Sequence, residues 1–438
     1  MLRDNTDMDL IDRLVVILSK FVSFVSTTFH LGAGATWPGE IALTLRPHIA
    51  ASLAKEFQKG VILVVGTNGK TTTSLMLKTI LEHVGDVVIH NATGANLLNG
   101  VVSSFIRHAD FLGRITADVG IFEVDENSLP IVLRYMKPSR IVVLNLFRDQ
   151  LDRYGEVDVI IEKWEKAFAA LPKETQVIIN ADDPGVAYLG KSVPGTVIYF
   201  GVQDKTKFLN VAEHATDSTF CPKCGNRLRY DGIYFSHLGL WTCPACGYTR
   251  PVPSVSAWPN PLPGLYNQYN TLAAVAVAGS LSVRDTDIAH ALKSFKPAFG
   301  RQEEIVMDGR TVKIFLSKNP AGFNASLRTV IEQRGQYFLF ALNDRIPDGR
   351  DVSWIWDVDF ETLPKSVRVT VSGDRVYDMA LRLKYAGVDT KRMDIEPNLM
   401  MAVTDALARV PKGQTLYVLP TYSAMLDIRE ILTGKKIL

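Results

Sequence analysis

The sequence predicts a protein of the α/β class, with a parallel sheet in a central domain, a four-cysteine insertion and a Rossmann-like α/β domain at its C-terminal end. Three observations predict this. Short β-rich runs alternate with helical segments from residue 61 onward, four cysteines gather where the alternation stops, and a second alternating series begins after Arg301. Such alternation is typical of parallel sheets covered by helices on both faces.

Composition limits the class of protein. The 438 residues correspond to about three domains of ordinary size, and 47% hydrophobic with 21% charged residues is ordinary for a soluble globular chain. The 48 basic and 46 acidic residues leave a net charge of +2, which argues against a nucleic-acid partner. No apolar run is long enough to span a bilayer.

Residues 1–55 are predicted to form an N-terminal helical segment. Its apolar core "LVVIL" is shorter than the hydrophobic region of a signal peptide, and acidic residues precede it, so the protein is expected in the cytoplasm. A stripe with helical spacing consists of Leu10, Leu14, Val15, Ile17, Leu18, Phe21, Val22 and Val25. The stripe is compatible with a helix packed on the body or with one at a membrane or partner surface, and packing is favoured.

The central domain is predicted over residues 56–300. Its β-rich runs are "VILVVG" (61–66), "VVIHNA" (87–92), "VGIFEVDE" (119–126), "RIVVLNL" (140–146) and "QVIINADD" (176–183). The segment "TTSLMLKTILEHV" between the first two runs has the period of a helix, and "NQYNTLAAVAVAGSL" (267–281) predicts a second, apolar helix.

A phosphate-binding loop is predicted at "GTNGKTTT" (66–73), between a strand and a helix. Two glycines allow a tight turn in which successive N–H groups point at anionic oxygens. Lys70 would reach the terminal phosphates of ATP, and the Thr71 hydroxyl would hold Mg²⁺. Val64 stands where the general motif has a glycine, so the loop is a shortened variant. The predicted nucleotide-binding residues here are Gly66, Thr67, Asn68, Gly69, Lys70, Thr71 and Thr72.

This loop, with motifs that follow it, resembles the Mur ligase family, whose members phosphorylate a carboxylate with ATP and let an amine displace the phosphate. The matching stretches are "EVDE" (123–126), "NLFRDQLDRYG" (145–155), "NADDP" (180–184), "GLYNQYNTLAA" (264–274) and "FGR" (299–301). A lone stretch of this kind would indicate little. The resemblance depends on all of them occurring in the family's order.

The resemblance implies roles for three further residues. Glu123 matches the family's Mg²⁺-binding glutamate, Asn267 the asparagine that contacts adenine, and Arg301 the hinge arginine that contacts nucleotide phosphate or ribose. Two positions depart from the family. Gln150 replaces a Mg²⁺-ligating histidine, which puts the second metal position in doubt, and Tyr266 replaces the histidine of the asparagine motif. The carbamylated lysine of several relatives cannot be placed.

The cysteines form two Cys-x-x-Cys pairs, "CPKCG" (221–225) and "CPACG" (243–247), inside a turn-rich segment, 205–255, that we interpret as an insertion. Their spacing predicts a zinc ribbon. The ligands would be Cys221, Cys224, Cys243 and Cys246, which close a tetrahedral shell and make the zinc structural. Two disulfides are disfavoured in a reducing cytoplasm. A redox dithiol is the remaining alternative.

The C-terminal α/β domain is predicted over residues 301–438, with strands at "TVKIFL", "YFLFAL", "VRVTVSG" and "TLYVLP". The insertion and "KNPAGFNASL … NDRIPDGRDVSWIWDVDFE" resemble one branch of the Mur ligase family. In that branch a GatD-type glutaminase subunit hydrolyses glutamine and delivers ammonia to the ligase subunit. The resemblance implies a heterodimer that amidates the α-carboxylate of D-glutamate in the lipid II stem peptide, giving D-isoglutamine.

The stretch "DGRDVSWIWD" (348–357) could be a solvated loop, a metal site or part of a partner's active site. The resemblance implies the last, with Asp351 completing the glutaminase's cysteine–histidine pair. Trp354 and Trp356 would seat that partner or pack beneath the loop. Lys70 and Glu123 would serve the phosphoryl transfer on the ligase side.

Two other classes of function remain open. One is a Mur-type ligase that acts alone on free amino acids, such as a glutamate-adding or folate-type enzyme. The other is a nucleotide-binding scaffold without catalysis, for which Gln150 is the best support. Contact with a membrane is expected to be peripheral at most, at its inner face and through the lipid substrate.

Overall fold

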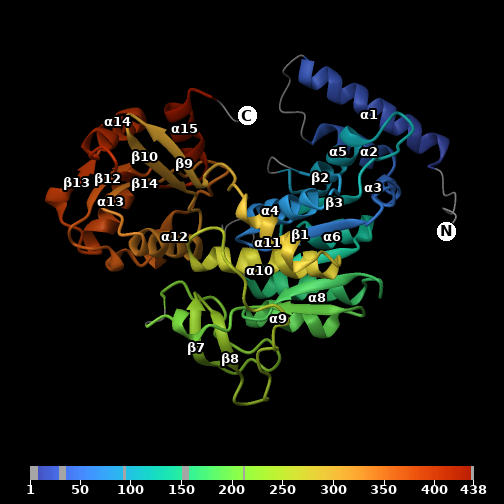
Figure 1. Ribbon diagram of the computed structural model, residues 1–438, viewed down its shortest axis with the longest axis horizontal. Coiled ribbons are helices and arrows are strands. Elements are labelled where there is room, and N and C mark those ends of the chain that lie inside the picture. The colour runs from blue at the N-terminus through green and yellow to red at the C-terminus, as the bar shows by residue number, and fades with distance from the viewer. Residues whose placement is uncertain (1–7, 29–35, 92–94, 150–156, 211–212, 436–438) are drawn as a thin grey trace.

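The computed structural model describes residues 8–28, 36–91, 95–149, 157–210 and 213–435. It contains two six-stranded sheets and one two-stranded sheet, and Figure 1 shows the two large sheets side by side with the small one below them. This arrangement confirms the predicted α/β class with a central parallel sheet and a cysteine-containing insertion. No helix in the described part of the chain is long and apolar enough to cross a membrane.

The first sheet is parallel throughout, with the strand order β2-β3-β1-β4-β5-β6. Its strands are β1 (Val61–Val65), β2 (Val88–His90), β3 (Val119–Val124), β4 (Arg140–Val143), β5 (Gln176–Asn180) and β6 (Val197–Phe200). All five residues of β1 are buried, because helices cover both faces of a parallel sheet and leave no polar side. The edge strand β6 was not among the predicted strands.

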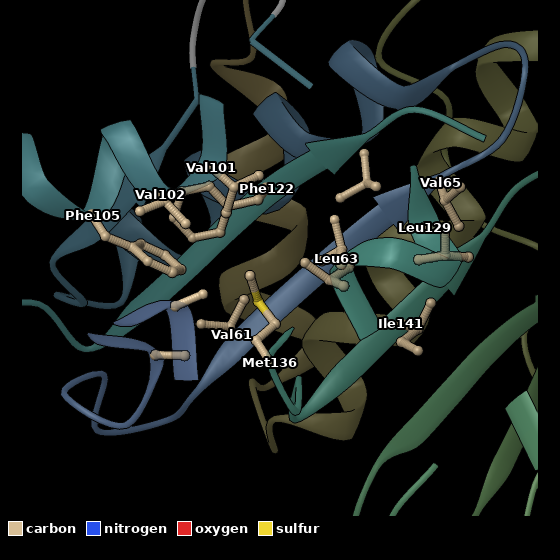
Figure 2. Packing of buried hydrophobic residues seen from close by; sticks show 14 of the residues in the cluster. Val61, Leu63, Val65, Val101, Val102, Phe105, Phe122, Leu129, Met136 and Ile141 are labelled. Carbon is tan, nitrogen blue, oxygen red and sulfur yellow. The ribbon is translucent and has the colours of Figure 1, made fainter. Parts of the chain in front are cut away.

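Alternate residues of β1 enter two different cores. Val61, Leu63 and Val65 pack with Phe105 and Phe122 on one face, as Figure 2 shows, whereas Ile62 and Val64 enter the core on the other face. The first face is covered by α5 (Leu98–His108), α6 (Leu129–Tyr135), α8 (Val157–Ala169) and α9 (Pro184–Tyr188). The second is covered by α4 (Lys70–His83), α10 (Leu265–Ser280) and α11 (Asp285–Lys293).

The N-terminal segment forms α1 (Leu10–Thr28), α2 (Trp37–Leu45) and α3 (Ile49–Ala54). The prediction that the apolar stripe of α1 packs on the body was wrong for most of its residues. Val15 is buried, but Leu10, Leu14, Ile17, Leu18 and Phe21 are exposed. The reason is that α1 contacts the body through a different face, which contains Asp12, Val15, Val16 and Ser19.

The second sheet is mixed, with the order β13-β12-β11-β14-β10-β9 and only β9 antiparallel to its neighbour. Its strands are β9 (Arg301–Met307), β10 (Arg310–Phe315), β11 (Tyr337–Ala341), β12 (Arg368–Ser372), β13 (Met393–Ile395) and β14 (Thr415–Pro420). One face packs against α12 (Pro320–Glu332) and α13 (Val376–Tyr385), the other against α14 (Leu399–Arg409) and α15 (Tyr422–Thr433). The predicted strands correspond to β10, β11, β12 and β14, and the sequence patterns missed β9 and β13.

The insertion contains an antiparallel hairpin of β7 (Arg229–Phe235) and β8 (Leu238–Thr242). Short 3-10 helices occur across the molecule at η1 (Leu189–Ser192), η2 (Lys205–Lys207), η3 (Ser353–Asp357), η4 (Phe360–Thr362) and η5 (Thr390–Arg392).

The hairpin of β7 and β8 is anchored to the first sheet. Trp241 is buried and donates its indole N–H to the Ala181 carbonyl (3.2 Å), which anchors β8 at the end of β5.

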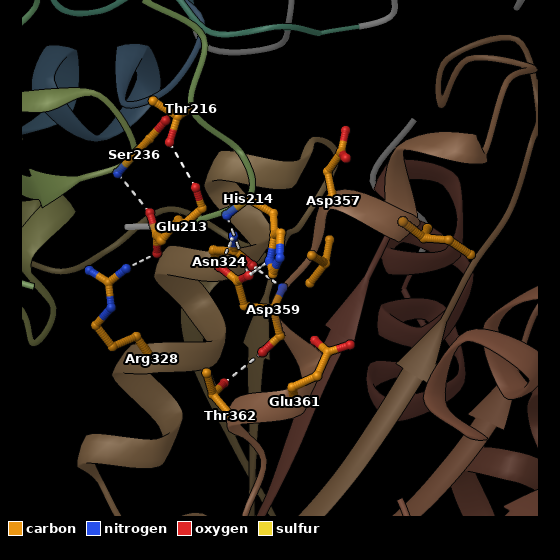
Figure 3. A network of polar contacts seen from close by, with 12 residues as sticks. Glu213, His214, Thr216, Ser236, Asn324, Arg328, Asp357, Asp359, Glu361 and Thr362 are labelled. Atoms are coloured by element: carbon orange, nitrogen blue, oxygen red, sulfur yellow. Dashed lines mark hydrogen bonds and ion pairs between the residues drawn. The ribbon is translucent and has the colours of Figure 1, made fainter. Parts of the chain in front are cut away.

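A polar network joins the insertion to the second sheet (Figure 3). Glu213 forms an ion pair with Arg328 of α12 and accepts a hydrogen bond from the Ser236 N–H at 2.6 Å. His214 Nδ1 lies 2.5 Å from Asp359, and the proximity of this carboxylate raises the pKa of His214. The insertion therefore contacts both halves of the molecule.

We predict that the core shown in Figure 2 dominates the stability of the first sheet. Phe105 is fully buried, with its ring centroid 4.9 Å from that of Phe122. Phe105→Ala should lower the free energy of unfolding by about 3–5 kcal/mol, because it removes contacts and leaves a cavity. The control is Phe111→Ala on an exposed loop, which should change it by less than about 0.5 kcal/mol. Equal shifts in a urea titration would contradict the prediction.

Candidate active site

The predicted phosphate loop connects the carboxyl end of β1 to the first turn of α4. Gly66 and Gly69 have φ values of 138° and 95°, a region that residues with a side chain rarely adopt. A Cβ at position 69 would lie only 2.1 Å from Asn270 Oδ1, so glycine is also required by space. This turn places the N-terminus of α4, with its unsatisfied N–H groups, at the end of the strand.

Lys70 is folded back over the loop. Its Nζ donates to the Gly66 carbonyl at 2.5 Å and to Glu126 Oε2 at 3.2 Å, and its side chain is largely buried. Glu126 lies in the "EVDE" stretch, but the sequence pattern assigned it no role. The ammonium group of Lys70 therefore lies at the mouth of the loop, paired with a carboxylate.

Thr71 and Glu123, the two predicted Mg²⁺ ligands, are brought together. The Thr71 hydroxyl donates to Glu123 Oε2 at 2.9 Å. Neighbouring ligands of an octahedral Mg²⁺ with bonds of 2.0–2.1 Å lie about 2.9 Å apart, and oxygen is the ligand atom this ion prefers. The pair therefore fits Mg²⁺. The other oxygen of Glu123 lies 3.6 Å from Nε2 of His90, a buried side chain that the sequence analysis missed.

Predicted nucleotide-binding residues from three separate stretches line one pocket. Asn68, Gly69 and Thr72 come from the loop, Asn267 from the start of α10, and Arg301 from the start of β9. Asn267 is buried and is oriented by donating to the Pro263 carbonyl at 2.8 Å. The structure thus brings together the residues predicted for the two ends of the nucleotide.

Two residues of the second sheet's loop after β10 also reach this site. They begin the quoted stretch "KNPAGFNASL", but the sequence analysis assigned them no role. Lys318 forms an ion pair with the buried Asp149. Burial acts to lower the pKa of Lys318, but the carboxylates of Asp149 and Glu126 outweigh it and raise the pKa, so the ammonium is charged. Asn319 exchanges two amide hydrogen bonds with Asn68, at 3.1 and 3.2 Å. The site is therefore built from both halves of the chain.

Two of the matching stretches have mixed outcomes, because "NLFRDQLDRYG" supplies Asp149, the partner of Lys318, whereas "NADDP" supports the end of β5. Gln150 lies outside the described residues, so its effect on a second metal position stays untested. In "NADDP", Asp183 accepts the N–H groups of Gly185 and Val186 and caps α9, while Asp182 pairs with Arg250 of the insertion at 2.6 Å. Both aspartates are buried and hold the end of β5 in place.

The three aspartates of "DGRDVSWIWD" have different roles. Asp348 is buried and accepts the Ser423 N–H at 2.8 Å, which anchors the loop to α15. Asp357 pairs with Arg148 at 3.3 Å. Asp351 is exposed on the loop after β11, and the N–H that Ser353 donates to it (2.8 Å) lowers the pKa of its carboxyl. Asp351 is therefore an ionised carboxylate presented to the outside.

The two tryptophans differ in their surroundings. Trp354 is partly buried and packs on Phe323, with ring centroids 6.1 Å apart. Trp356 is 49% exposed and stands edge-on to Tyr385 of α13. We call the exposed residues Trp356, Tyr377, Leu381 and Tyr385 the α13 patch. Trp354 thus packs beneath the loop and Trp356 faces outward, whereas contact with a partner stays a prediction.

The four cysteines form one cluster. Their Sγ atoms all lie within 4.8 Å of one another, with 3.7 Å between Cys221 and Cys246 and 3.5 Å between Cys224 and Cys243. A tetrahedral zinc with Zn–S bonds of about 2.3 Å has sulfur atoms about 3.8 Å apart, whereas a disulfide needs about 2.05 Å. The cluster could hold Zn²⁺ and is not disulfide-bonded.

Comparison with known proteins identifies the family. Residues 64–278 match the model of the Mur ligase middle domain, and residues 316–425 match the model described as MurT ligase C-terminal. The chain is 31% identical over 430 residues to the MurT subunit of lipid II isoglutaminyl synthase (glutamine-hydrolyzing) from Streptococcus pneumoniae, covering 93% of this chain and 94% of that protein. The chain belongs to the MurT family of Mur ligases.

Solved Mur ligases share the fold of this MurT-family chain. A pseudomurein peptide ligase type C from Methanothermus fervidus superposes with a TM-score of 0.65 at 23% identity, over 85% of this chain and 78% of that one. MurF from Thermotoga maritima, solved in complex with ADP, gives 0.60 at 17% identity, over 89% and 83%. In the MurT-family chain the two family matches cover different parts of the candidate site. The phosphate loop lies in the first match, and Lys318 and Asp351 lie in the second.

We predict that the cysteine cluster binds about one zinc per chain. Cys243→Ser should abolish zinc binding and unfold the insertion locally, because the binding energy of a structural metal contributes to folding. Elemental analysis measures the metal, and limited proteolysis should show new cleavage within residues 205–255. Thr242→Ser, next to a ligand, should leave both unchanged. Wild-type protein purified without chelators and lacking zinc would contradict the prediction.

Proposed function

We propose that this chain is the ligase subunit of a lipid II isoglutaminyl synthase. It would use ATP to convert the α-carboxylate of D-glutamate in the lipid II stem peptide into the amide, with ammonia from a GatD-type glutaminase subunit. The observation that carries the proposal is the combination of a nucleotide site with an exposed carboxylate, Asp351, on a separate loop. The name of the relative from S. pneumoniae supports the same assignment.

The chemistry requires activation of a carboxylate. A carboxylate oxygen of the substrate would attack the γ-phosphorus of ATP, and ADP would leave, giving an acyl phosphate. Ammonia would then attack the carbonyl carbon, inorganic phosphate would leave, and the nitrogen would lose a proton to give the amide. Lys70 and Lys318 lie where they can offset negative charge on the transferring phosphoryl group, which lowers the barrier of such reactions.

Metal ions would support two separate parts of the molecule. When bound, Mg²⁺ would neutralise phosphate charge, and Thr71 with Glu123 would hold it. Asn68, Gly69, Thr72, Asn267 and Arg301 would contact the rest of the nucleotide. Zn²⁺ would stabilise the insertion, because four thiolates leave no position open for a substrate.

The ammonia source must be a partner. The chain has four cysteines, and all of them lie in the cluster, so no thiol is left to attack glutamine. A glutaminase of this type needs a cysteine, a histidine and a carboxylate that orients the imidazole. Asp351 would supply that carboxylate. The α13 patch begins a few residues along the chain from Asp351 and offers the exposed aromatic surface typical of protein interfaces.

We predict that Lys70→Ala abolishes amidation. Its ammonium is expected to contact the transferring phosphoryl group, so its loss should lower the rate about a hundredfold or more at saturating ATP. Folding should be retained, because Lys70 belongs to the first turn of α4 and not to a hydrophobic core. Circular dichroism checks this, since the side chain is largely buried beside Glu126. The control is Lys78→Ala on the same helix, where the lysine forms only a surface pair with Glu82 (3.3 Å). Near-wild-type turnover of Lys70→Ala would refute the assigned role.

We further predict that Asp351→Asn impairs the use of glutamine as ammonia source without separating the two subunits. Glutamine-dependent amidation should fall on the order of a thousandfold, because the asparagine cannot stabilise the partner's imidazolium. Complex formation and ATP binding should be retained, and externally added ammonia should restore part of the amidation. Glutamate release from glutamine and amide formation are measured in parallel.

The matched control is Asp405→Asn on α14. This exposed aspartate lies on the face of the second sheet opposite the α13 patch. It should behave as wild type in every assay. Unchanged glutamine hydrolysis by Asp351→Asn would show that Asp351 is not the missing carboxylate. Amidation of a free amino acid without a glutaminase would favour a stand-alone ligase, and the absence of ATP turnover under all conditions would favour a scaffold.

A further inference from the structure

The outward face of α1 is an apolar ridge. Its exposed residues are Leu10, Ile11, Leu14, Ile17, Leu18, Phe21 and Phe24. The two phenylalanines are 62% and 65% exposed, although side chains of this size are usually buried in a folded protein. The spacing of these residues places them on one side of a helix of 19 residues, which is about 28 Å long. A continuous apolar surface of this kind marks an interaction site.

The side chains of α1 that are buried in the body lie on the side of the helix opposite the ridge. They include Val15, Val16 and Ser19. Asp12, also on this side, pairs with Arg46 at 2.7 Å. The largest apolar side chains of α1 therefore point outward while small and polar ones face the protein, which is the reverse of an ordinary surface helix.

A neighbouring loop extends the ridge. Phe111 is 67% exposed and Leu112 is 46% exposed, in the segment that follows α5. Lys20 of α1 connects the two elements, because its Nζ donates to the Arg107 carbonyl at 3.3 Å and lies 5.8 Å from the centroid of the Phe111 ring. The ridge and the two exposed loop residues thus form a single surface, which we call the α1 surface.

Cations border the α1 surface on the side of the loop. Lys20, Arg107 and Arg114 lie along its border on the side of the loop, and residues 13–25 contain no acidic side chain. Among the described residues, Asp9, Asp12 and Asp110 beside the ridge each have local hydrogen-bond or ion-pair partners. Asp110 accepts the N–H groups of Leu112 and Arg114, each at 2.8 Å, and Asp9, like Asp12, is paired with Arg46. An apolar ridge with a basic border is complementary to a bilayer that carries anionic lipids.

We propose that the α1 surface docks on an anionic membrane, with its apolar side chains in the boundary between headgroups and acyl chains and its cations at the headgroup phosphates. The biological purpose of this docking rests on the proposed function, since a lipid-linked substrate has to be met at a bilayer. Figure 1 shows α1 on the opposite side of the molecule from α13. The membrane and a glutaminase on the α13 patch would therefore bind at the same time.

The test is co-sedimentation of the full chain with vesicles that contain no substrate. Wild type should bind vesicles of phosphatidylcholine mixed with phosphatidylglycerol. The double variant Phe21→Ser, Phe24→Ser should bind with a partition coefficient lower by about tenfold or more, because two apolar side chains no longer leave water. The control is Met400→Ser with Met401→Ser, an exposed apolar pair on helix α14, which should bind as wild type.

A second pair of variants tests the basic border. Arg107→Gln and Arg114→Gln should each weaken binding to the anionic vesicles by about fivefold. They should have little effect on binding to phosphatidylcholine alone, and added salt should reduce the difference between them and wild type. Equal effects on both kinds of vesicle would contradict the assignment of the border to anionic lipid.

Two results would overturn the proposal. One is wild-type protein that does not bind anionic vesicles, or a double variant that binds as well as wild type. The other is a wild-type chain that is dimeric in solution and becomes monomeric in the double variant without any vesicle binding, which would assign the α1 surface to a second copy. Unchanged circular dichroism of the variant verifies that its folding is intact.

The experiments also distinguish failure of the proposed function from failure of the membrane-docking proposal. If the chain binds vesicles but the complex does not amidate lipid II in detergent, the membrane surface stands and the proposed function fails. If the double variant amidates detergent-solubilised lipid II at the wild-type rate but is slowed on lipid II in vesicles, both are supported.

Discussion

The pairing of Asn68 with Asn319 is the contact on which the rest of the candidate site depends. One carboxamide belongs to the phosphate loop and the other to the N-cap of α12, and each donates to and accepts from the other. Beside them, Lys318 reaches across to Asp149. Because Asn319 and Asp149 are buried, one end of each contact is shielded from water, which strengthens it. The second sheet is thereby held with a cation facing the phosphate loop.

The insertion also holds the two sheets together. Arg250 pairs with Asp182 at the end of β5, while Glu213 pairs with Arg328 of α12, so one segment is attached to both sheets. Such a segment limits how the sheets can move relative to one another, and its own fold depends on a cluster of four cysteines. A structural metal there would act on the site through this rigidity, without contacting the nucleotide or the substrate.

The proposed activities occupy separate surfaces of one chain. The nucleotide pocket lies between the sheets, the α13 patch and Asp351 lie on the second sheet, and the α1 surface lies beyond the first. The separation follows from the chemistry of the three ligands. Phosphates require convergent N–H groups and cations, a protein partner requires an exposed aromatic surface, and a bilayer requires a long apolar face with a basic border.

The sequence alone determined what depends on short stretches of chain. The strand–glycine–helix pattern predicted the phosphate loop, and two Cys-x-x-Cys pairs predicted one cluster, because both are set by backbone geometry over a few residues. Only the tertiary structure decided which face of α1 is buried, and that Trp354 packs inward while Trp356 does not. Lys318 and Asp149 are 169 positions apart, and no local pattern indicates such a pair. Periodicity shows that a helix has an apolar face, whereas the shape of the surface it meets decides which face is covered.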